Sequence, residues 1–521
     1  MATSPPRPAV AVDLLERWLL PAGVVGALIL GVVGIGRFLR LDEANSVIIA
    51  SSNIGRLLEY LRNDNNLPFY YLLLHVWIRV AGIREWAVHL PSVVCYLVAI
   101  GVVYQLGWEV LQDRKAALYS GFFYLVSSQA VYQAQKTRMY SLLGLLAAVS
   151  TLLMFRVWWQ DTASKRDWVL YVLVNALGTF VHVWYFFLLL AHALCGLIFQ
   201  SKKLRSLAAA QFAAVVPFLV LWARYLPRQA KIGAVDWMPH VHASFFVSVF
   251  GEFYGGERWG LLFLLAVAGM CVVGAWKSGR QGQVVLRPVG ALVTIALVCM
   301  MVPLLVSFVR PIYWPGRYTM IALPAFATAL GCAVAAWASP VLRVGFAYVV
   351  LVVAIVIHVR TRNEVFENSV NVFTEGESDK ATTLKLCQQA GPHDTLVFTG
   401  LTRAGVEYYL RRLGCGSGLH LVSIPADTAE HLGWVRTTSP EELRAEADQV
   451  ARQFLEPGDD DRKLWLIVGH GVTSNLRGVT ETLDRELGDG REQSLRGSLF
   501  DEVVVYPHPG AARSIASPQP H

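Results

Sequence analysis

The sequence has 521 residues, of which 55% are hydrophobic and only 16% are charged, and its mean hydropathy is +0.44. A soluble protein of this size would carry about 25% charged residues, so the composition excludes an ordinary soluble enzyme and favours a polytopic α-helical membrane protein. The net charge of +7 does not indicate a nucleic-acid partner, because many basic residues lie in short loops between apolar runs, as is typical of cytoplasmic loops.

About eleven apolar runs are long enough to cross a bilayer core of about 30 Å. We predict transmembrane spans at about residues 18–36, 86–107, 116–133, 139–156, 168–182, 184–200, 207–226, 258–276, 288–309, 318–337 and 341–359. An odd number of spans places the amino terminus in the cytoplasm and the carboxyl terminus outside, with the basic loops inside. The predicted location is therefore the inner or plasma membrane of the cell, crossed many times.

Two segments on the predicted outer side are long. Residues 37–85 have helical periodicity but too many polar groups to span, so we expect amphipathic helices along the interface. Residues 227–257 are rich in aromatic side chains, which favour the membrane–water interface. Residues 1–360 are thus predicted to form one transmembrane domain with these two extracytoplasmic loops.

The composition changes to that of a soluble domain after about residue 360. "DTLVFTG" and "KLWLIVG" predict buried strands, and "SPEELRAEADQVARQFL" predicts an amphipathic helix that begins after a serine cap. Alternating strands and helices favour a small extracytoplasmic α/β domain over 361–508, and 509–521 is predicted to be disordered. Cys387 and Cys415 lie in this domain and can form one disulfide in an oxidising compartment.

Distinctive polar clusters follow the first span, and the predicted topology places all of them on the outer side. They are Asp42-Glu43, "NDNNLP", "QAQKTRMY", "HVWY", "DWMPH" and "RPIYWPGRY". Six separate loops on one side can meet as a single polar chamber, and polar groups are costly enough near membranes to indicate function. The alternative is that loops are simply where polar residues belong.

Several strings in these segments resemble those of a known family. They are "DEA" after the first span, "LPFYYLLLHVWIRVAGIREWAVHLPSVV", "RMYSLL", "HVWYFFLLLAHAL" and "RYTMIALPAFATALG". In this order, over about residues 18–340, they resemble the family 39, dolichyl-phosphate-mannose-type glycosyltransferases, including bacterial members, within the C-type integral-membrane superfamily. The resemblance implies an enzyme that moves a hexose or pentose from a polyprenyl-phosphate donor to a lipid, glycan or protein acceptor on the extracytoplasmic face.

Two departures from the family pattern concern the site. Bacterial relatives commonly have His-Pro-Pro before the "LYYLLL" string, where this chain has Asn65-Asn66-Leu67-Pro68. Many relatives have an acid two residues before the arginine of "RMY", where this chain has Lys136. The second departure puts in doubt a second carboxylate and any divalent metal (Mg²⁺ or Mn²⁺) that it would help to bind, which leaves Asp42 or Glu43 as the candidate ligands.

The reaction implied by the resemblance needs a base that takes the proton of the acceptor hydroxyl, and direct displacement by that hydroxyl inverts the sugar carbon. Asp42 matches the family's acidic residue after the first span, so we predict that it is the base, with a pKa raised by desolvation at the membrane edge. Glu43 is the second catalytic candidate, either as a metal ligand or as a first-turn acid of an interfacial helix. The alternative for Asp42 is a helix cap.

The leaving phosphate needs cationic or hydrogen-bonding groups. We predict that Arg317 and Arg138 bind it, because a guanidinium matches phosphate oxygens with two parallel hydrogen bonds. Tyr140 and Tyr318 follow these arginines and can donate hydrogen bonds to the same phosphate. The alternatives are interfacial snorkelling for the arginines and an aromatic belt for the tyrosines.

Four further residues are candidates for binding the donor or acceptor: Asp64, Asn66, His182 and Trp237. Asp64 and Asn66 can contact the acceptor or a metal, and Trp237 can stack on a sugar face. A single histidine at a helix end is more often structural, and a tryptophan in an aromatic loop can equally be an interface anchor.

Other classes of function compete with this interpretation. A transporter or flippase of lipid-linked sugars would be expected to have inverted repeats, broken helices or charges near the bilayer midplane, and none is clear in this sequence. A polysaccharide polymerase or ligase fits Asp42-Glu43 and the C-terminal domain poorly. A membrane sensor would leave the six polar clusters without an explanation.

Overall fold

The computed structural model describes residues 7–32, 35–159, 163–199, 201–231, 238, 240–255, 280–314, 316–337, 339–370, 378–426, 438–457, 461–469, 477–493, 495–497 and 500–508. The span predicted at 258–276, the sugar-stacking candidate Trp237 and the predicted disordered tail at 509–521 lie outside these residues.

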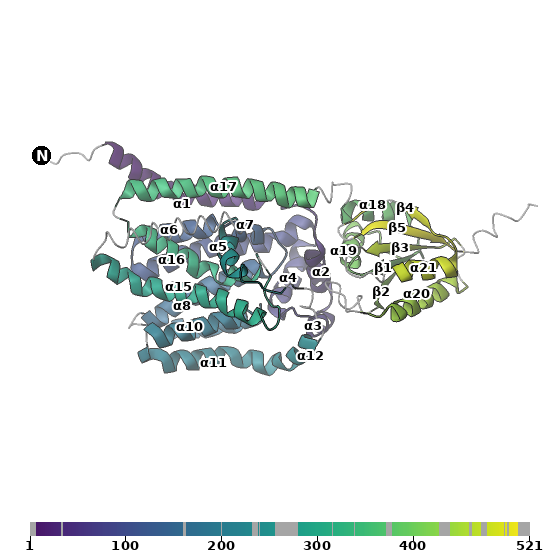
Figure 1. The fold of residues 1–521 in the computed structure, drawn as a ribbon, viewed down its shortest axis with the longest axis horizontal. Helices are drawn as coiled ribbons and strands as arrows, with labels where there is room; N and C mark the ends of the chain where they lie inside the picture. The colour runs from purple at the N-terminus through teal and green to yellow at the C-terminus, as the bar shows by residue number, and fades with distance from the viewer. Residues whose placement is uncertain are drawn as a thin grey trace, which may run out of the picture.

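Helices of different lengths, most of them apolar, lie in one bundle (Figure 1). They are α1 (Arg7–Val32), α5 (Glu85–Leu111), α6 (Arg114–Leu125), α7 (Ser128–Ala134), α8 (Tyr140–Trp159), α9 (Lys165–Thr179), α10 (Tyr185–Phe199), α11 (Leu204–Leu221), α15 (Arg280–Ser307), α16 (Leu323–Ala335) and α17 (Pro340–Val370). Each predicted span among the described residues coincides with one of these helices, or with α6 and α7 together. The helical positions are therefore confirmed.

Within the part of the chain that the structure describes, four helices combine the length and the hydropathy needed to cross a membrane: Glu85–Leu111, Tyr140–Trp159, Leu204–Leu221 and Leu286–Ser307. Three further helical segments are apolar but shorter: Tyr185–Phe199, Leu323–Ala335 and Pro340–Val356. The apolar helices support a multi-pass membrane protein, and the count of about eleven spans stays a prediction.

Small residues bring the central helices together. A Cβ atom at Gly331 of α16 would overlap the backbone of Ser120 in α6, and a Cβ atom at Gly107 of α5 would overlap the Ser120 side chain. Close backbone approach at small residues is how apolar helices pack where hydrocarbon surrounds them. Helix α6 is consequently held between α5 and α16, and this core positions the loops on either side of α7.

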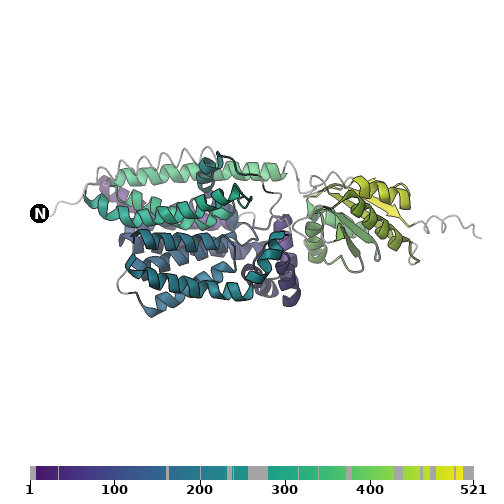
Figure 2. The same ribbon diagram turned by 60° about the horizontal axis from the view of Figure 1, so that its bottom comes forward.

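Short helices cluster at the end of the bundle where the C-terminal unit lies (Figures 1 and 2). The first predicted loop contributes α2 (Leu41–Ser51), α3 (Ile54–Arg62) and α4 (Pro68–Ala81), and the second begins with α12 (Leu226–Lys231). The remaining short elements are α13 (Phe245–Gly251) and the 3-10 turns η1 (Ser201–Lys203), η2 (Ala223–Tyr225), η3 (Glu252–Tyr254) and η4 (Tyr318–Ile321). The prediction that residues 37–85 are helical is confirmed.

The C-terminal unit contains a five-stranded mixed sheet in the order β2-β1-β3-β5-β4. Its strands are β1 (Thr395–Thr399), β2 (His420–Ile424), β3 (Lys463–Gly469), β4 (Arg491–Gln493) and β5 (Phe500–Pro507). Its helices are α18 (Asp379–Gln389), α19 (Arg403–Leu413), α20 (Pro440–Leu455) and α21 (Arg477–Leu487). β1 is parallel to β2 and β3, whereas β5 is antiparallel to β3 and β4.

Alternating side chains of β1 divide the core into two layers. Leu396 and Phe398 pack in the cluster formed with α18 and α19, and Val397 packs in the cluster formed with α20 and α21. This is the two-residue period of a strand that is buried on both faces. The two predicted strands are confirmed, and so is the predicted serine cap, because Ser439 accepts a hydrogen bond from the N–H of Glu442 at the start of α20.

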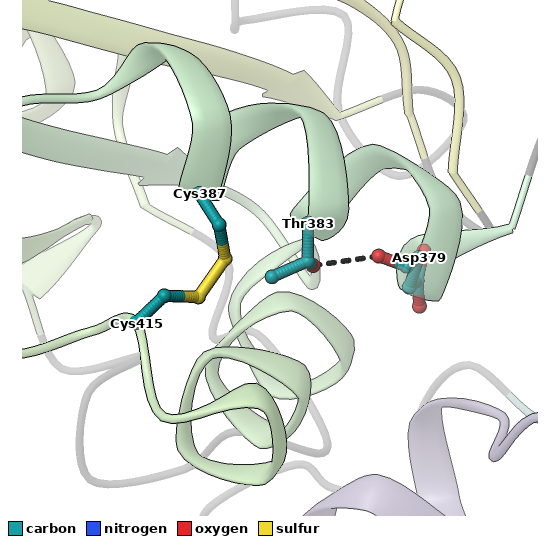
Figure 3. The surroundings of a disulfide bond; sticks show 4 residues. All are labelled: Asp379, Thr383, Cys387 and Cys415. Carbon is teal, nitrogen blue, oxygen red and sulfur yellow. Dashed lines mark hydrogen bonds between the residues drawn. A yellow bond between two sulfur atoms is a disulfide. The ribbon is translucent and has the colours of Figure 1, made fainter.

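A disulfide joins Cys387 in α18 to Cys415 just after α19, which confirms the predicted pairing (Figure 3). It closes a segment with a sequence separation of 28. One turn earlier in α18, the hydroxyl of Thr383 donates a hydrogen bond to the carbonyl of Asp379 at 2.6 Å. The disulfide therefore links the ends of the two helices that cover one face of the sheet.

Helix α19 connects the α/β unit to the helical bundle. The hydroxyl of Tyr409 accepts a hydrogen bond from the backbone N–H of Leu39 at 3.0 Å, and the hydroxyl of Tyr408 donates to the carbonyl of Ile83 at 2.7 Å. Both tyrosines are buried. The α/β unit thus packs on the segments that precede α2 and α5.

Candidate functional site

Asp42 lies in the first turn of α2 and faces Arg317. Its Oδ2 atom accepts a hydrogen bond from Nη1 of Arg317 at 3.0 Å, and the two side chains are 33% and 31% exposed. Arg317 directly precedes η4, so the fold joins residues that are 275 positions apart in sequence. The structure thus brings the predicted base and the first predicted phosphate ligand into direct contact at a site open to solvent.

Nearby cations determine the charge state of Asp42. Burial raises the pKa of the carboxyl, but Arg138, Arg317 and Lys136 more than offset this and hold the pKa below its ordinary value. The expectation of a raised pKa was wrong, because no local sequence pattern indicates that three cations lie around this carboxylate. Asp42 is therefore an ionised carboxylate at neutral pH.

Glu43 is buried and points into a different set of contacts. It accepts hydrogen bonds from Arg37 at 2.8 and 3.0 Å, from Nε2 of His89 at 3.0 Å and from the N–H of Thr137 at 2.9 Å. It also accepts from the N–H of Arg40 at 3.3 Å, so Glu43 caps α2. Burial raises its pKa, but Arg37, other cations and the bond from His89 lower it to well below its ordinary value.

These contacts join α2 to α5 and to the loop before α8. A carboxylate that accepts so many donors has few lone pairs left for a substrate. We therefore assign Glu43 a positioning role: it fixes the first turn of α2, and with it the direction of its neighbour Asp42.

Arg138 is buried beside α2 and lies two residues before the start of α8. It donates from Nη1 to the Asp42 carbonyl at 3.3 Å, to the Ser46 hydroxyl at 3.1 Å and to the Tyr71 hydroxyl at 3.3 Å. Its other terminal nitrogen donates to Oδ1 of Asn66 at 3.4 Å. The second predicted phosphate ligand is thus held in a fixed orientation next to the first.

Asp64 and Asn66 reach the site as one unit. Oδ2 of Asp64 accepts from the side-chain amide of Asn66 at 2.9 Å, which turns Oδ1 of Asn66 toward Arg138. Oδ1 of Asp64 accepts from the N–H of Asn65. A chain of hydrogen bonds therefore runs from Asp64 through Asn66 to Arg138, and the two predicted substrate-binding residues support the arginine from the loop between α3 and α4.

Three predicted residues, Tyr140, His182 and Tyr318, pack their rings together next to Arg138. The ring centroids of His182 and Tyr140 lie 5.0 and 6.0 Å from that of Tyr318, and Trp184 lies 5.0 Å from Tyr318. The guanidinium of Arg138 lies 5.9 Å from the Tyr140 ring. Burial, with the charge of Arg138, lowers the pKa of His182 to about 3, so this ring in the loop after α9 is neutral.

Some residues of the site were missed in the sequence. Ser46 and Tyr71 accept hydrogen bonds from Arg138. Of the two, Tyr71 lies within the "LPFYYLLL" string, and Ser46 had no signal in the sequence. Lys136 was noted as a departure from the family, and it adds a positive charge close to Asp42 and Glu43. Glu252 contacts the loop that carries Arg317, and no pattern in its aromatic segment distinguished it.

The residues at Asp42 do not fit a divalent metal. Metal sites of Mg²⁺ or Mn²⁺ gather oxygen ligands, but here the Asp42 carboxylate is paired with Arg317 and lies in the field of Arg138 and Lys136. Glu43 is occupied by its own donors. Within the described residues, no group of three His, Cys, Asp or Glu side chains has metal-binding geometry. The excess of positive charge instead suits an anionic ligand.

Part of the chain matches a known protein family in sequence. The sequence pattern of the dolichyl-phosphate-mannose-protein mannosyltransferase family matches residues 65–226, which include Asn66, Arg138, Tyr140 and His182. None of the curated proteins matches the chain in sequence.

Solved structures share the fold over nearly the whole length. The crystal structure of ArnT from Cupriavidus metallidurans in the apo state superposes with a TM-score of 0.63 and 15% identity, covering 96% of this chain and 98% of ArnT. The structure of the same protein bound to undecaprenyl phosphate gives a TM-score of 0.64 and 15% identity, covering 96% and 99%. Residues 65–226 thus match the sequence pattern of this mannosyltransferase family, and the chain as a whole shares the fold of ArnT.

Proposed function

We propose that the protein transfers a sugar from a polyprenyl-phosphate donor to an acceptor hydroxyl on the extracytoplasmic face of the membrane. The observation that carries this proposal is the convergence of Arg317, Arg138 and Lys136 on the single carboxylate of Asp42. One carboxylate can accept a proton, and the surplus cations can stabilise a phosphate that gains negative charge as it leaves.

Arg138 is prepared for an anionic ligand. Its side chain is only 8% exposed, and its Nε atom has no hydrogen-bond partner among the described residues. A buried donor without a partner costs free energy, which a ligand oxygen would recover. We assign the donor phosphate to the space between Arg138 and Arg317, where both guanidinium groups can contact it.

An apolar cavity can hold the first part of the polyprenyl chain. It has a volume of about 210 Å³, and its lining combines Leu73 and Trp77 of α4, Cys95 of α5 and Leu142 of α8 with Arg138. The cavity thus presents hydrocarbon-compatible walls with a cation beside them, which matches the two chemical parts of a polyprenyl phosphate. Undecaprenyl phosphate, bound in the ArnT structure, is a carrier of this chemical class.

The proposed step is a direct displacement. The acceptor oxygen forms a bond to the anomeric carbon as the bond between that carbon and the phosphate oxygen breaks, and the electron pair leaves with the phosphate. The acceptor's proton goes to Asp42. Because the acceptor attacks opposite the leaving group, the configuration at the sugar carbon inverts, and no covalent enzyme intermediate is needed.

The charges also explain how a carboxylate of low pKa can serve as the base. Donor phosphate placed against Arg317 and Arg138 adds negative charge near Asp42 and weakens the hold of both arginines on it. Its pKa then rises toward a range useful for proton transfer. Donor binding would therefore activate the base.

The test is transfer from defined donors. Purified protein in detergent or nanodiscs is incubated with a panel of polyprenyl-phosphate hexoses and pentoses, and released polyprenyl phosphate is quantified with and without membrane lipid, glycan or peptide acceptors. We expect release with at least one donor and acceptor, and release slowed by about 10²–10⁴-fold in the Asp42→Asn variant. Equal release by this variant and the native protein would reject the proposed site.

A further inference from the structure

Glu252 lies outside the predicted site but binds the loop that carries Arg317. Its Oε2 atom accepts a hydrogen bond from the N–H of Gly316 at 2.8 Å and from the hydroxyl of Thr319 at 2.9 Å. Its Oε1 atom accepts from the hydroxyl of Tyr313. One carboxylate therefore holds three points of the segment 313–319, on both sides of Arg317.

Two glutamines of α7 also hold this segment. Nε2 of Gln133 donates to the carbonyl of Gly316 at 2.5 Å, and Nε2 of Gln129 donates to the Thr319 hydroxyl at 2.6 Å. Gly316 has a φ of +71°, a conformation that favours glycine, so the chain turns sharply just before Arg317. At Gly316 both polar groups of the backbone are bonded, the N–H to Glu252 and the carbonyl to Gln133.

The side chain of Arg317 is left to reach across to Asp42. The Arg317 side chain extends from the segment between Gly316 and Thr319 and contacts Asp42 at 3.0 Å, and 31% of this side chain is exposed. The direction of the guanidinium thus depends on a backbone segment that Glu252 holds by three hydrogen bonds and α7 by two.

We propose that Glu252 is the positioning residue for Arg317, acting as a clamp on segment 313–319 that aims the guanidinium at the donor phosphate. The proposal rests on the proposed function and deepens it by adding a residue from the second outer loop. Because its carboxylate accepts hydrogen bonds from the loop, Glu252 acts through Arg317 and not on the substrate.

Two substitutions at Glu252 separate positioning from chemistry. Glu252→Gln keeps an amide oxygen for the Gly316 and Thr319 donors, and its amide nitrogen can donate to the Tyr313 hydroxyl. We expect it to retain kcat within a few-fold. Glu252→Ala removes the bonds from Tyr313, Gly316 and Thr319 and leaves the two bonds from α7. Misplacement of a catalytic group by about 1 Å costs about a hundredfold, so kcat should fall by about ten- to a hundredfold. Equal, large losses in both variants would mean that Glu252 acts chemically, and the clamp would be rejected.

A double-mutant cycle identifies the partner. If Glu252 acts through Arg317, Glu252→Ala causes no further loss in an Arg317→Ala background, whereas independent roles give multiplied losses. If the fold-losses of kcat in the two single variants multiply in the double variant, the proposal is overturned. The matched control is Glu59→Ala, an exposed acid on α3, which should leave kcat unchanged. Thr319→Val is a milder second variant if Glu252→Ala does not fold, and it should lower kcat in the same, non-additive way.

A second readout does not depend on turnover. Amide hydrogen exchange over 313–319 should be faster in Glu252→Ala than in the native protein, and close to native in Glu252→Gln and Glu59→Ala. If the native protein releases no polyprenyl phosphate, the proposed function fails while the exchange data still decide the clamp. Unchanged exchange in Glu252→Ala would overturn the clamp whatever the enzyme does.

Discussion

Asp42 and Glu43 are neighbours in sequence and differ in almost every physical respect. Asp42 is one-third exposed and faces one arginine, whereas Glu43 is buried and accepts hydrogen bonds from several donors of α5 and two loops. Successive residues of a helix point about 100° apart, so one turn of α2 sends the two carboxylates into different surroundings. The pair therefore combines the proposed base with a carboxylate that holds the structure around it.

Arg317 is expected to depend on its shape as well as on its charge. A lysine at this position keeps the charge but loses the planar fork that contacts two oxygens, so Arg317→Lys should impair turnover nearly as much as Arg317→Ala. The measurement is kcat and donor KM for both variants. Full activity of the lysine variant would mean that Arg317 supplies only a general positive charge.

The pH dependence follows from the cations around Asp42. Because they hold its pKa below the ordinary value of 3.8, the base stays ionised through the neutral range, and the acidic limb of kcat/KM should lie below about pH 4. Arg317→Ala removes one of these cations, which raises the pKa of Asp42, so the limb should move to higher pH. The profile of Arg56→Ala, an exposed arginine of α3, serves as the control. An identical limb with and without Arg317 would contradict the assignment of this limb to Asp42.

At the scale of elements, helix α19 supports the segments that enter the site. Glu85, at the start of α5, forms ion pairs with Lys380 at 3.1 Å and Arg412 at 3.5 Å. These ion pairs attach the α/β unit at the start of α5, and the Tyr409 bond to Leu39 attaches it three residues before Asp42. A domain that looks separate in sequence is thus part of the framework of the site.

Tyr409→Phe tests this support. The substitution removes only a hydroxyl and leaves the buried N–H of Leu39 without its acceptor, which typically costs about 1–3 kcal/mol. We expect a lower melting temperature in detergent and a reduced kcat, because α2 loses a fixed point near Asp42. Tyr60→Phe is the control, because it also removes a tyrosine hydroxyl in the segment 37–85, but on α3 and away from α19. Native stability and turnover in Tyr409→Phe would show that the α/β unit does not support the site.

Sequence patterns predicted the helices and strands but only part of the site. Helix positions follow from long apolar runs, and the short apolar run "KLWLIVG" predicts a buried strand, so local signals sufficed there. The partners of Glu43 come from separate segments at Arg37, His89 and Thr137, and the bonds of Glu252 cross more than sixty residues. No local pattern reports such meetings, because they depend on how distant elements pack.

For the whole molecule, the central expectation is that the site and the α/β unit share the extracytoplasmic side. The two meet at α19 and α2, so they must lie on the same side of the membrane. Positive residues in the opposite loops predict that this side is outside. The Cys387–Cys415 disulfide agrees with an oxidising compartment.

A reporter that is active only in the cytoplasm tests this topology. Fused after residue 508, it should be silent, and fused after residue 163, in the predicted cytoplasmic loop between α8 and α9, it should be active. Signal at position 508 would place both the α/β unit and Asp42 in the cytoplasm, and a donor on the outer face would then be excluded.

The most direct measurement is a comparison of donor affinity and single-turnover rate in Asp42→Asn and the native protein. Asparagine keeps the size of the side chain but cannot take the proton, and loss of a general base typically lowers the rate by about 10²–10⁴-fold. We expect that fall in rate with donor affinity largely preserved, because Arg138 and the apolar cavity remain in place. A near-native rate would remove Asp42 from the mechanism and contradict the account of the site.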